Sequence, residues 1–443
     1  MKIIKKNKDF IVGVLILSFI IFSISIFSIE IFSNIRIEDN LSNIFYNLGR
    51  FMGLIGFLSL SILILSGETA RFFDRFFGID KIIKFQRKFS IFSLIMVIFH
   101  PIFFIISDRN MINFLIPGSI NLIITLGSVS LYLMILIGLA SHFYKLISYK
   151  VWQIIHIGIY GLFVMSAYHA MNGTAYLTNQ TIRILINTII IALIIGSIFR
   201  TIKKIKEYFN SNYYVYKTEK ETKNIFSLIL KPKNKNKLMK FKAGQFCFLR
   251  INKNKLHARH PFTISSSPED NFLKFTIKIE GRFTKTAEKI KVGEPICVDG
   301  PYGKFHTKQN DENLIFIAGG VGITPFRSML GELVNLGTNK NVRLIYCCRT
   351  TEDILFKNFF DSIDKKWFDV KYILSREKSN NWNENENKIL GRLNKEIIKK
   401  ELLDLKNPIF YFCGPETLKK ETMKILDELG VKKRNIYSED FFW

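Results

Sequence analysis

The chain has 443 residues, which is enough for two or three domains. It carries 63 lysine and arginine residues against 37 acidic residues, a formal net charge of +26. A charge of this size would suit nucleic-acid binding, but the placement of the basic residues along the chain argues against it, and we expect no nucleic-acid partner. All five cysteines lie in the second half and form no CxxC pair, which is typical of a reduced compartment without disulfides or iron–sulfur clusters.

Apolar residues are concentrated in the first 200 positions, in long uninterrupted runs. Each run is close to the ~20 residues that a helix needs to cross the hydrocarbon core of a bilayer. The first is too long for a signal peptide and lacks a small-residue cleavage site, so we interpret it as a retained helix. The sequence therefore predicts six transmembrane helices, over residues 10–32, 48–66, 89–107, 120–140, 151–171 and 182–199.

Basic residues in this half are distributed unequally between the two sides that six helices define. One side receives 13 lysines and arginines, whereas the other receives four. Because basic loops face the cytoplasm, both chain ends are predicted to be cytoplasmic, in a multi-pass protein of the cell membrane.

The second half has a different texture, with short strands separated by turn residues. Closely spaced strands predict a small antiparallel barrel, over 213–218, 225–230, 245–251, 272–279 and 294–299. Strands and helices then alternate, which predicts a parallel doubly wound sheet. Its strands are expected at 314–318, 342–347, 370–374 and 409–413, and its helices at 324–336 and 352–363. Residues 377–390 are predicted to form a solvated loop. We expect three domains, over residues 1–205, 206–308 and 309–443.

Three histidines lie inside the predicted membrane helices, where ionisable residues are costly and usually functional. His100 is on the third helix, and His156 and His169 are on the fifth. Neutral imidazoles on facing helices can hold a haem iron between them, so all three are candidate metal ligands. Thirteen residues advance a helix by ~20 Å, which suits two stacked haems, but they do not return to the same helix face. Either this helix bends, or His156 has another purpose such as hydrogen bonding to a neighbouring helix.

The segments around these histidines, Phe85–Lys88, His100-Pro101 and Trp152–His169, resemble the membrane domain of the ferric reductase/NADPH oxidase family. That family places two histidines 14 residues apart on the third helix and two on the fifth. Gln86 stands here at the first of these four positions. The resemblance implies haem b, with one or two haems, because the pair of His100 and His169 is complete whereas His156 lacks its usual partner.

The segment Asn47–Gly53 also resembles the second helix of this family. The resemblance implies that Arg50 faces the outer haem propionates or the electron acceptor. The alternative is an interfacial side chain that extends to the lipid head groups.

The soluble half resembles the ferredoxin-NADP reductase family along its whole length. Pro261 stiffens the flavin strand, Thr263 and Ser266 are potential donors to FAD, and Arg259 is placed to bind its pyrophosphate. A second phosphate loop follows, because Gly281 allows close approach and Thr284 begins a helix, whose N-terminus favours anions. The candidate flavin residues are Arg259, His260, Pro261, Phe262, Thr263, Ser265, Ser266, Lys278, Gly281, Phe283 and Thr284.

A glycine-rich segment follows an apolar strand and opens a helix, as a dinucleotide pyrophosphate loop requires. Its candidate residues are Gly319, Gly320, Gly322, Thr324 and Pro325. Proline suits the first helical turn.

The next two strands end at Arg349, Ser375 and Arg376, where the adenosine ribose is expected. Arginine there pairs with a 2′-phosphate, so the sequence favours NADPH over NADH.

The last predicted strand ends in Cys413-Gly414-Pro415, and the chain closes with several aromatic residues. The resemblance places Cys413 beside the nicotinamide ring. It also implies that a terminal aromatic residue stacks on the flavin; Phe441 is favoured by register and Trp443 is the alternative.

We therefore expect a membrane-embedded flavohaem oxidoreductase that carries electrons from NAD(P)H through FAD and haem to an outer acceptor. Oxygen or ferric iron is the favoured acceptor, and a quinone or a partner protein is the alternative. A flavin-regulated membrane scaffold without enzymatic activity is a further alternative. The sequence does not predict the oligomeric state.

Overall fold

The computed structural model describes residues 2–33, 35, 40–144, 146–209, 212–234, 238–251, 260–308, 312–338, 340–364, 366–377, 387–403 and 405–439. The chain divides into two compact units, Met1–Lys204 and Ile205–Trp443.

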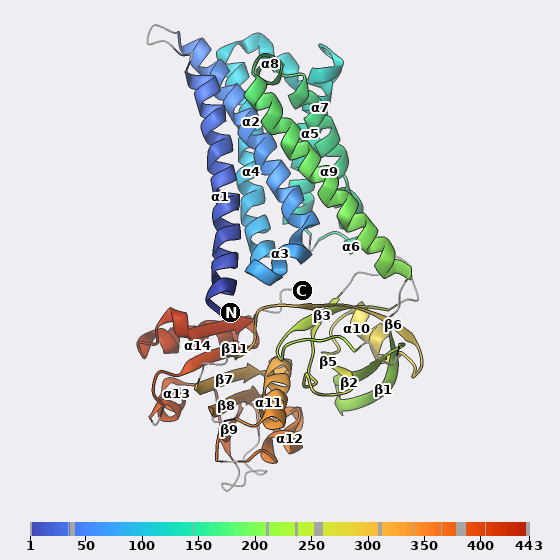
Figure 1. The fold of residues 1–443 in the computed structure, drawn as a ribbon, viewed down its shortest axis with the longest axis vertical. Coiled ribbons are helices and arrows are strands. Elements are labelled where there is room, and N and C mark those ends of the chain that lie inside the picture. Colours follow the sequence, from blue (N-terminus) through green and yellow to red (C-terminus); the bar gives the residue numbers. More distant parts are fainter. Residues whose placement is uncertain are drawn as a thin grey trace. The chain divides into compact units, whose positions relative to one another are not determined.

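The first unit is a bundle of helices (Figure 1). The helices are α1 (Lys2–Phe32), α2 (Leu41–Glu68), α3 (Ala70–Phe77), α4 (Ile79–Ser107), η1 (Arg109–Leu115), α5 (Leu122–His142), α6 (Tyr149–Ile157), α7 (Ile159–Met171), α8 (Thr174–Thr178) and α9 (Gln180–Phe209). Within the described residues, six helical segments are long and apolar enough to cross a membrane, which confirms the predicted number. They are Gly13–Phe32, Leu41–Glu68, Lys81–Ser107, Leu122–His142, Val151–Met171 and Gln180–Ile202.

The centre of the bundle is α2, which buries a larger share of its length than any other spanning helix of the described chain. It packs against α4, while α7 packs against α5. Large apolar side chains such as Leu15, Ile91 and Val164 remain exposed, which suits contact with lipid. The fifth span is interrupted at Gly158, which separates α6 from α7.

The second unit begins with a six-stranded sheet of order β4-β3-β6-β1-β2-β5, antiparallel at every pairing. Its elements are β1 (Tyr213–Thr222), β2 (Ile225–Pro232), β3 (Phe246–Ile251), β4 (His260–Thr263), β5 (Leu273–Lys278), β6 (Pro295–Tyr302) and α10 (Arg282–Glu288). The predicted closed barrel is not found in the described residues. The edge strands β4 and β5 meet only through an isolated bridge between Ile264 and Phe275. The four-residue β4 is too short to form a full ladder with β5, so the sheet stays open.

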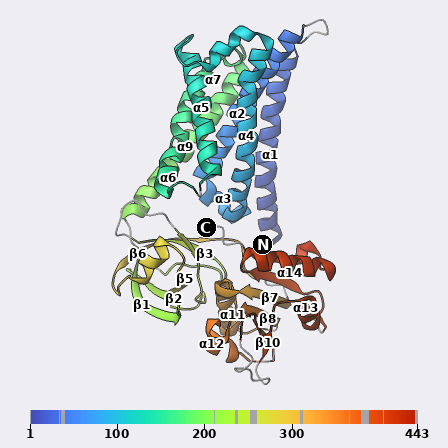
Figure 2. The ribbon, with the colours of Figure 1, turned by 180° about the vertical axis from the view of Figure 1, so that it is seen from behind.

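The rest of this unit is a parallel sheet of order β10-β9-β8-β7-β11-β12, covered by helices on both faces (Figure 2). Its elements are β7 (Asn313–Gly319), η2 (Gly320–Ile323), α11 (Thr324–Leu336), β8 (Asn341–Cys348), η3 (Thr351–Asp353), α12 (Lys357–Asp361), β9 (Phe368–Leu374), β10 (Lys388–Leu390), α13 (Lys395–Leu402), β11 (Ile409–Cys413), α14 (Glu416–Glu428), η5 (Lys433–Asn435) and β12 (Ile436–Glu439). Phe316 of β7 packs against Phe326 of α11, whereas its neighbour Ile317 belongs to the opposite core with Leu426 of α14. The doubly wound fold is therefore as predicted.

Two local predictions in this domain were wrong. The helix expected over 352–363 is broken, because Phe356 has a left-handed φ of 57° and separates η3 from α12. The segment expected as a loop over 377–390 contributes strand β10, which pairs in parallel with β9 at the sheet edge. Residues 378–386 lie outside the described residues.

Candidate functional site

Two histidine side chains face one another inside the helical unit. His100 of α4 and His169 of α7 have ring centroids 6.2 Å apart, with an interplanar angle of 75°. Two metal–imidazole bonds of ~2 Å, extended to the ring centres, place the centroids of two ligands ~6 Å apart. The spacing therefore fits a single iron held between the two imidazoles.

Each of these rings is oriented by a backbone carbonyl of a neighbouring helix. His100 Nδ1 lies 2.7 Å from the carbonyl oxygen of Gly49 on α2, and His169 Nδ1 lies 2.9 Å from that of Ile123 on α5. A carbonyl can only accept, so each Nδ1 carries the proton and each Nε2 keeps its lone pair for a metal. This donor set fits a haem with two axial histidines.

Gln86 and His156, the positions that would hold a second haem, are arranged differently. The Gln86 amide donates to Ser66 Oγ at 2.9 Å, and His156 stacks on Trp152 with centroids 4.8 Å apart. In the described residues, only His100 and His169 face each other as a pair of histidine rings. Groups of three or more potential ligands among His, Cys, Asp and Glu are also absent from the described chain. That absence does not bear on a haem, whose porphyrin supplies the other four ligands.

A buried ionic cluster in the helical unit was not anticipated from the sequence. Glu68, at the end of α2, is 6% exposed and pairs with Arg200 of α9. Tyr160 of α7 donates to Glu68 at 2.6 Å and contacts Arg200 at 2.5 Å. A buried carboxylate requires such partners, and here they join α2, α7 and α9. The glutamate in an apolar run was the only sequence signal.

Arg50 projects from α2 one residue after Gly49. Its Nη1 donates to Asn47 Oδ1 at 3.2 Å, and the residue is half-buried. Arg50 thus follows directly the residue whose carbonyl orients His100.

In the soluble unit, strand β4 contains a buried hydroxyl that lacks a partner. Thr263 is 4% exposed, and its Oγ1 has no hydrogen-bond partner among the described residues. Such a group costs ~1–3 kcal/mol unless something satisfies it. The unpaired hydroxyl therefore fits a position where a cofactor completes the site.

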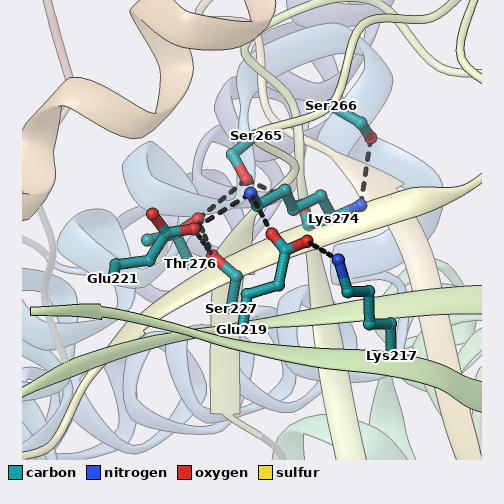
Figure 3. Close-up of polar contacts among 8 residues, drawn as sticks. All are labelled: Lys217, Glu219, Glu221, Ser227, Ser265, Ser266, Lys274 and Thr276. Atoms are coloured by element: carbon teal, nitrogen blue, oxygen red, sulfur yellow. Dashed lines mark hydrogen bonds and ion pairs between the residues drawn. The ribbon is translucent and has the colours of Figure 1, made fainter. Parts of the chain in front are cut away.

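Both serines that follow have a hydrogen-bond partner within the protein (Figure 3). Ser265 Oγ donates to the carbonyl oxygen of Lys274 at 3.0 Å, and Ser266 Oγ accepts from the amide of Lys274 at 3.1 Å. The Lys274 ammonium pairs with Glu219 and Glu221, each at 2.9 Å. These serine hydroxyls stabilise the turn between β4 and β5.

The predicted phosphate loop is closed by its own threonine. Thr284 Oγ1 accepts from the amide of Gly281 at 3.0 Å and donates to the Gly281 carbonyl at 3.0 Å. Lys278 is paired with Glu280. The ring centroid of Phe283 lies 4.2 Å from that of His260 and 5.8 Å from that of Phe262. These ring contacts join the loop to β4.

An open pocket beside this loop is lined by three cations of α10 and its C-terminal flank, Arg282, Lys285 and Lys289. The sequence analysis did not single out these residues, although their three- and four-residue spacing on a helix places them on one face.

The glycine-rich loop after β7 packs tightly on the end of β11. A Cβ atom on Gly322 would lie 2.3 Å from the carbonyl oxygen of Cys413, and one on Gly319 would lie 2.7 Å from Pro415. Gly320 has a φ of +55°, which favours glycine. Thr324 and Pro325 begin α11 directly afterwards, and Cys413 itself is buried. The structure thus brings the glycine-rich loop and Cys413-Gly414-Pro415 together.

Two exposed arginines stand at the carboxyl ends of β8 and β9. The amide of Arg376 donates to the carbonyl of Arg349 at 2.8 Å, so the two residues are adjacent. Neither guanidinium has an ion-pair partner among the described residues. Ser375 donates to the Cys348 carbonyl at 3.2 Å, and burial raises the pKa of the Cys348 thiol to about 12.

Three family models match the chain in succession. They are a ferric reductase like transmembrane component over residues 52–167, an FAD-binding domain over 210–306 and an oxidoreductase NAD-binding domain over 316–424. This is the architecture of the ferric reductase/NADPH oxidase family. A membrane domain joined to FAD- and NAD-binding domains is the architecture of a membrane oxidoreductase.

Proteins of other organisms resemble part of the chain. A flavohemoprotein of Bacillus anthracis is 28% identical over 251 residues, covering 52% of this chain and 60% of that protein. The Na(+)-translocating NADH-quinone reductase of Marinomonas sp. contains a polypeptide that is 27% identical over 199 residues, covering 41% of this chain and 48% of that polypeptide. The chain thus spans about half of the length of these relatives. A flavohemoglobin structure from Malassezia yamatoensis has 19% identity and a TM-score of 0.48, covering 64% of this chain and 73% of that one.

Some positions that the ferric reductase/NADPH oxidase resemblance singled out lie outside the described residues. They are Arg259, Phe441 and Trp443.

Proposed function

We propose that this protein carries electrons from cytoplasmic NADPH, by way of FAD and one haem b, to an acceptor at the outer face of the cell membrane. The proposal is supported above all by His100 and His169, whose rings face each other at 6.2 Å in a chain that also has FAD- and NAD-binding domains. Its three functional parts are residues 1–205, 206–308 and 309–443. The excess of basic residues on one side supports cytoplasmic termini.

When bound, FAD accepts a hydride from NAD(P)H and releases single electrons, and haem b carries one electron at a time. His100 and His169 would hold the haem iron through their Nε2 atoms, with the rings oriented by the carbonyls of Gly49 and Ile123. Arg50 provides a positive charge for a haem propionate or for an anionic acceptor.

For the flavin, Thr263 is assigned the most direct role because its buried hydroxyl lacks a protein partner in the described chain. Ser265 and Thr284 act by shaping the backbone around the cofactor, since their hydroxyls already donate to backbone carbonyls. Ser266 accepts from the amide of Lys274 and keeps its proton to donate to FAD. The remaining proposed flavin residues are Arg259, His260, Pro261, Phe262, Lys278, Gly281, Phe283 and the stacking residue Phe441.

For the nicotinamide nucleotide, the proposed site is built on the close packing of Gly322 against the Cys413 carbonyl. Gly319, Gly320, Thr324 and Pro325 present the start of α11 to the pyrophosphate. Gly414 and Pro415, which pack directly on this loop, are proposed to lie beside the nicotinamide. Arg349 and Arg376 have no ion-pair partner among the described residues and, with Ser375 directly after β9, support a 2′-phosphate. They therefore favour NADPH, although NADH stays possible at this site.

Oxygen and ferric chelates are the proposed acceptors. The test uses the purified full chain with NADPH and a reporter of electron transfer. Reporter reduction that superoxide dismutase abolishes would identify oxygen, and reduction of a ferric chelate that is insensitive to this enzyme would identify iron. Failure of both acceptors, with the haem still reduced by NADPH, would contradict this choice.

A second candidate function is the reduction of a quinone or of a partner protein through a single haem. The hydrogen bond from Gln86 to Ser66 favours a single haem in both candidate functions, because this amide occupies the position of the usual fourth histidine and is already engaged. A His156→Ala variant that retained all of its haem would support the single-haem relay, whereas loss of half of the haem would contradict it.

A further inference from the structure

The two histidines are held by the same local arrangement, which occurs once on α2 and once on α5. His100 donates to the carbonyl of Gly49, and four residues later α2 has Gly53. His169 donates to the carbonyl of Ile123, and four residues later α5 has Gly127. In an α-helix the carbonyl of residue i accepts from the amide of residue i+4. Each imidazole therefore shares a helical carbonyl with the amide of a glycine.

The glycines are required sterically by the orientation of these rings. A Cβ atom on Gly53 would lie 2.6 Å from Nδ1 and 2.7 Å from Cε1 of His100. A Cβ atom on Gly127 would lie 2.8 Å from the same two atoms of His169. Any side chain at either position would turn the ring away from its carbonyl or force the helices apart.

We infer that Gly53 and Gly127 are positioning residues that lock the two axial imidazoles nearly perpendicular to each other. The inference rests on the proposed haem between His100 and His169. The carbonyl fixes the direction of each Nδ1–H bond, and the glycine leaves free the space that the ring occupies when it makes this bond. The resulting angle between the ring planes is 75°.

The angle has a consequence for the iron. Each imidazole donates π density to the iron d orbital that lies perpendicular to its own plane. Perpendicular planes treat two d orbitals alike and leave them close in energy, whereas parallel planes separate them. Ligand orientation is therefore a means by which the protein tunes the metal.

The experiment is low-temperature electron paramagnetic resonance of the oxidised full chain, purified in detergent, together with its haem content. The wild-type protein is expected to give one highly anisotropic low-spin feature at high g. In Gly53→Ala and Gly127→Ala this feature is expected to give way to an ordinary rhombic signal with three resolved g values.

Gly56→Ala is the matched control, because its Cβ would lie 2.9 Å from Val97 of α4 and not from a histidine. This substitution crowds α2 against α4, as Gly53→Ala does, but away from His100. The spectrum of the Gly56→Ala variant is expected to match that of the wild type. A rhombic wild-type signal, or equal changes in the Gly53 and Gly56 variants, would overturn the inference while leaving the haem in place. A protein without low-spin haem would overturn the proposed function as well.

Discussion

The unpaired hydroxyl of Thr263 allows a prediction in which two effects have opposite signs. In Thr263→Val the side-chain shape is kept and the hydroxyl is removed. Because Thr263 is buried and its Oγ1 has no partner in the described chain, the FAD-free protein should lose a penalty of ~1–3 kcal/mol and become more stable. The bond that FAD would make is lost too, so the dissociation constant for FAD should rise by roughly 5- to 150-fold.

The assay compares the full chain with and without FAD. For a soluble unit of this size, 1 kcal/mol corresponds to a shift of roughly 2–4 °C in melting temperature. The melting temperature of the FAD-free variant should therefore rise by at least ~2 °C, and a titration with FAD should show weaker binding.

Thr422→Val is the matched control. Thr422 is fully buried in α14, and its hydroxyl also lacks a partner among the described residues. Its replacement should raise stability and leave FAD binding unchanged. If Thr263→Val destabilised the FAD-free protein, or bound FAD as tightly as the wild type, the assignment of this hydroxyl to the flavin would be refuted.

Three further predictions concern other parts of the chain. Gly322→Ala places a methyl group 2.3 Å from the Cys413 carbonyl, so stability should fall by ~1–3 kcal/mol in thermal unfolding, with weaker NADPH binding by titration. Arg349→Ser should raise the KM for NADPH and leave that for NADH nearly constant, and equal increases in steady-state assays would refute a 2′-phosphate contact. The hydrogen bond from Lys217, followed by that from Lys274, holds the pKa of Glu219 below its ordinary value of 4.5. The contribution of Glu219 to stability is complete above pH 4.5 and is lost as the pH falls through the depressed pKa. Glu219→Gln should therefore flatten this part of the profile of unfolding free energy against pH. An unchanged profile would contradict the assignment.

Much of the fold could be predicted because its signals are local. The apolar runs predicted six membrane helices, and the helix of 324–336 and the strand of 409–413 were predicted with the bounds that the structure shows. The open sheet could not be predicted, because closure depends on whether β4 reaches β5 across the sheet. The break at Phe356 depends on one left-handed residue that the apolar pattern does not mark.

The candidate sites divide in the same way. His100 and His169 were recognised because histidine is rare in apolar helices. The part played by Gly53 could not be foreseen, because its partner His100 is distant in sequence and the contact exists only after α2 and α4 pack. Ser266 was expected to donate to FAD, and the structure adds that its oxygen accepts from an amide of β5, a contact that no local pattern reveals.

The most direct test of the account is to measure haem per FAD in the purified full chain, add NADPH without oxygen, and record the haem spectrum. The account predicts one low-spin haem for each FAD, reduced by NADPH and lost in both the His100→Ala and the His169→Ala variants. A haem that stays oxidised while the flavin is reduced, or one that survives both substitutions, would contradict it.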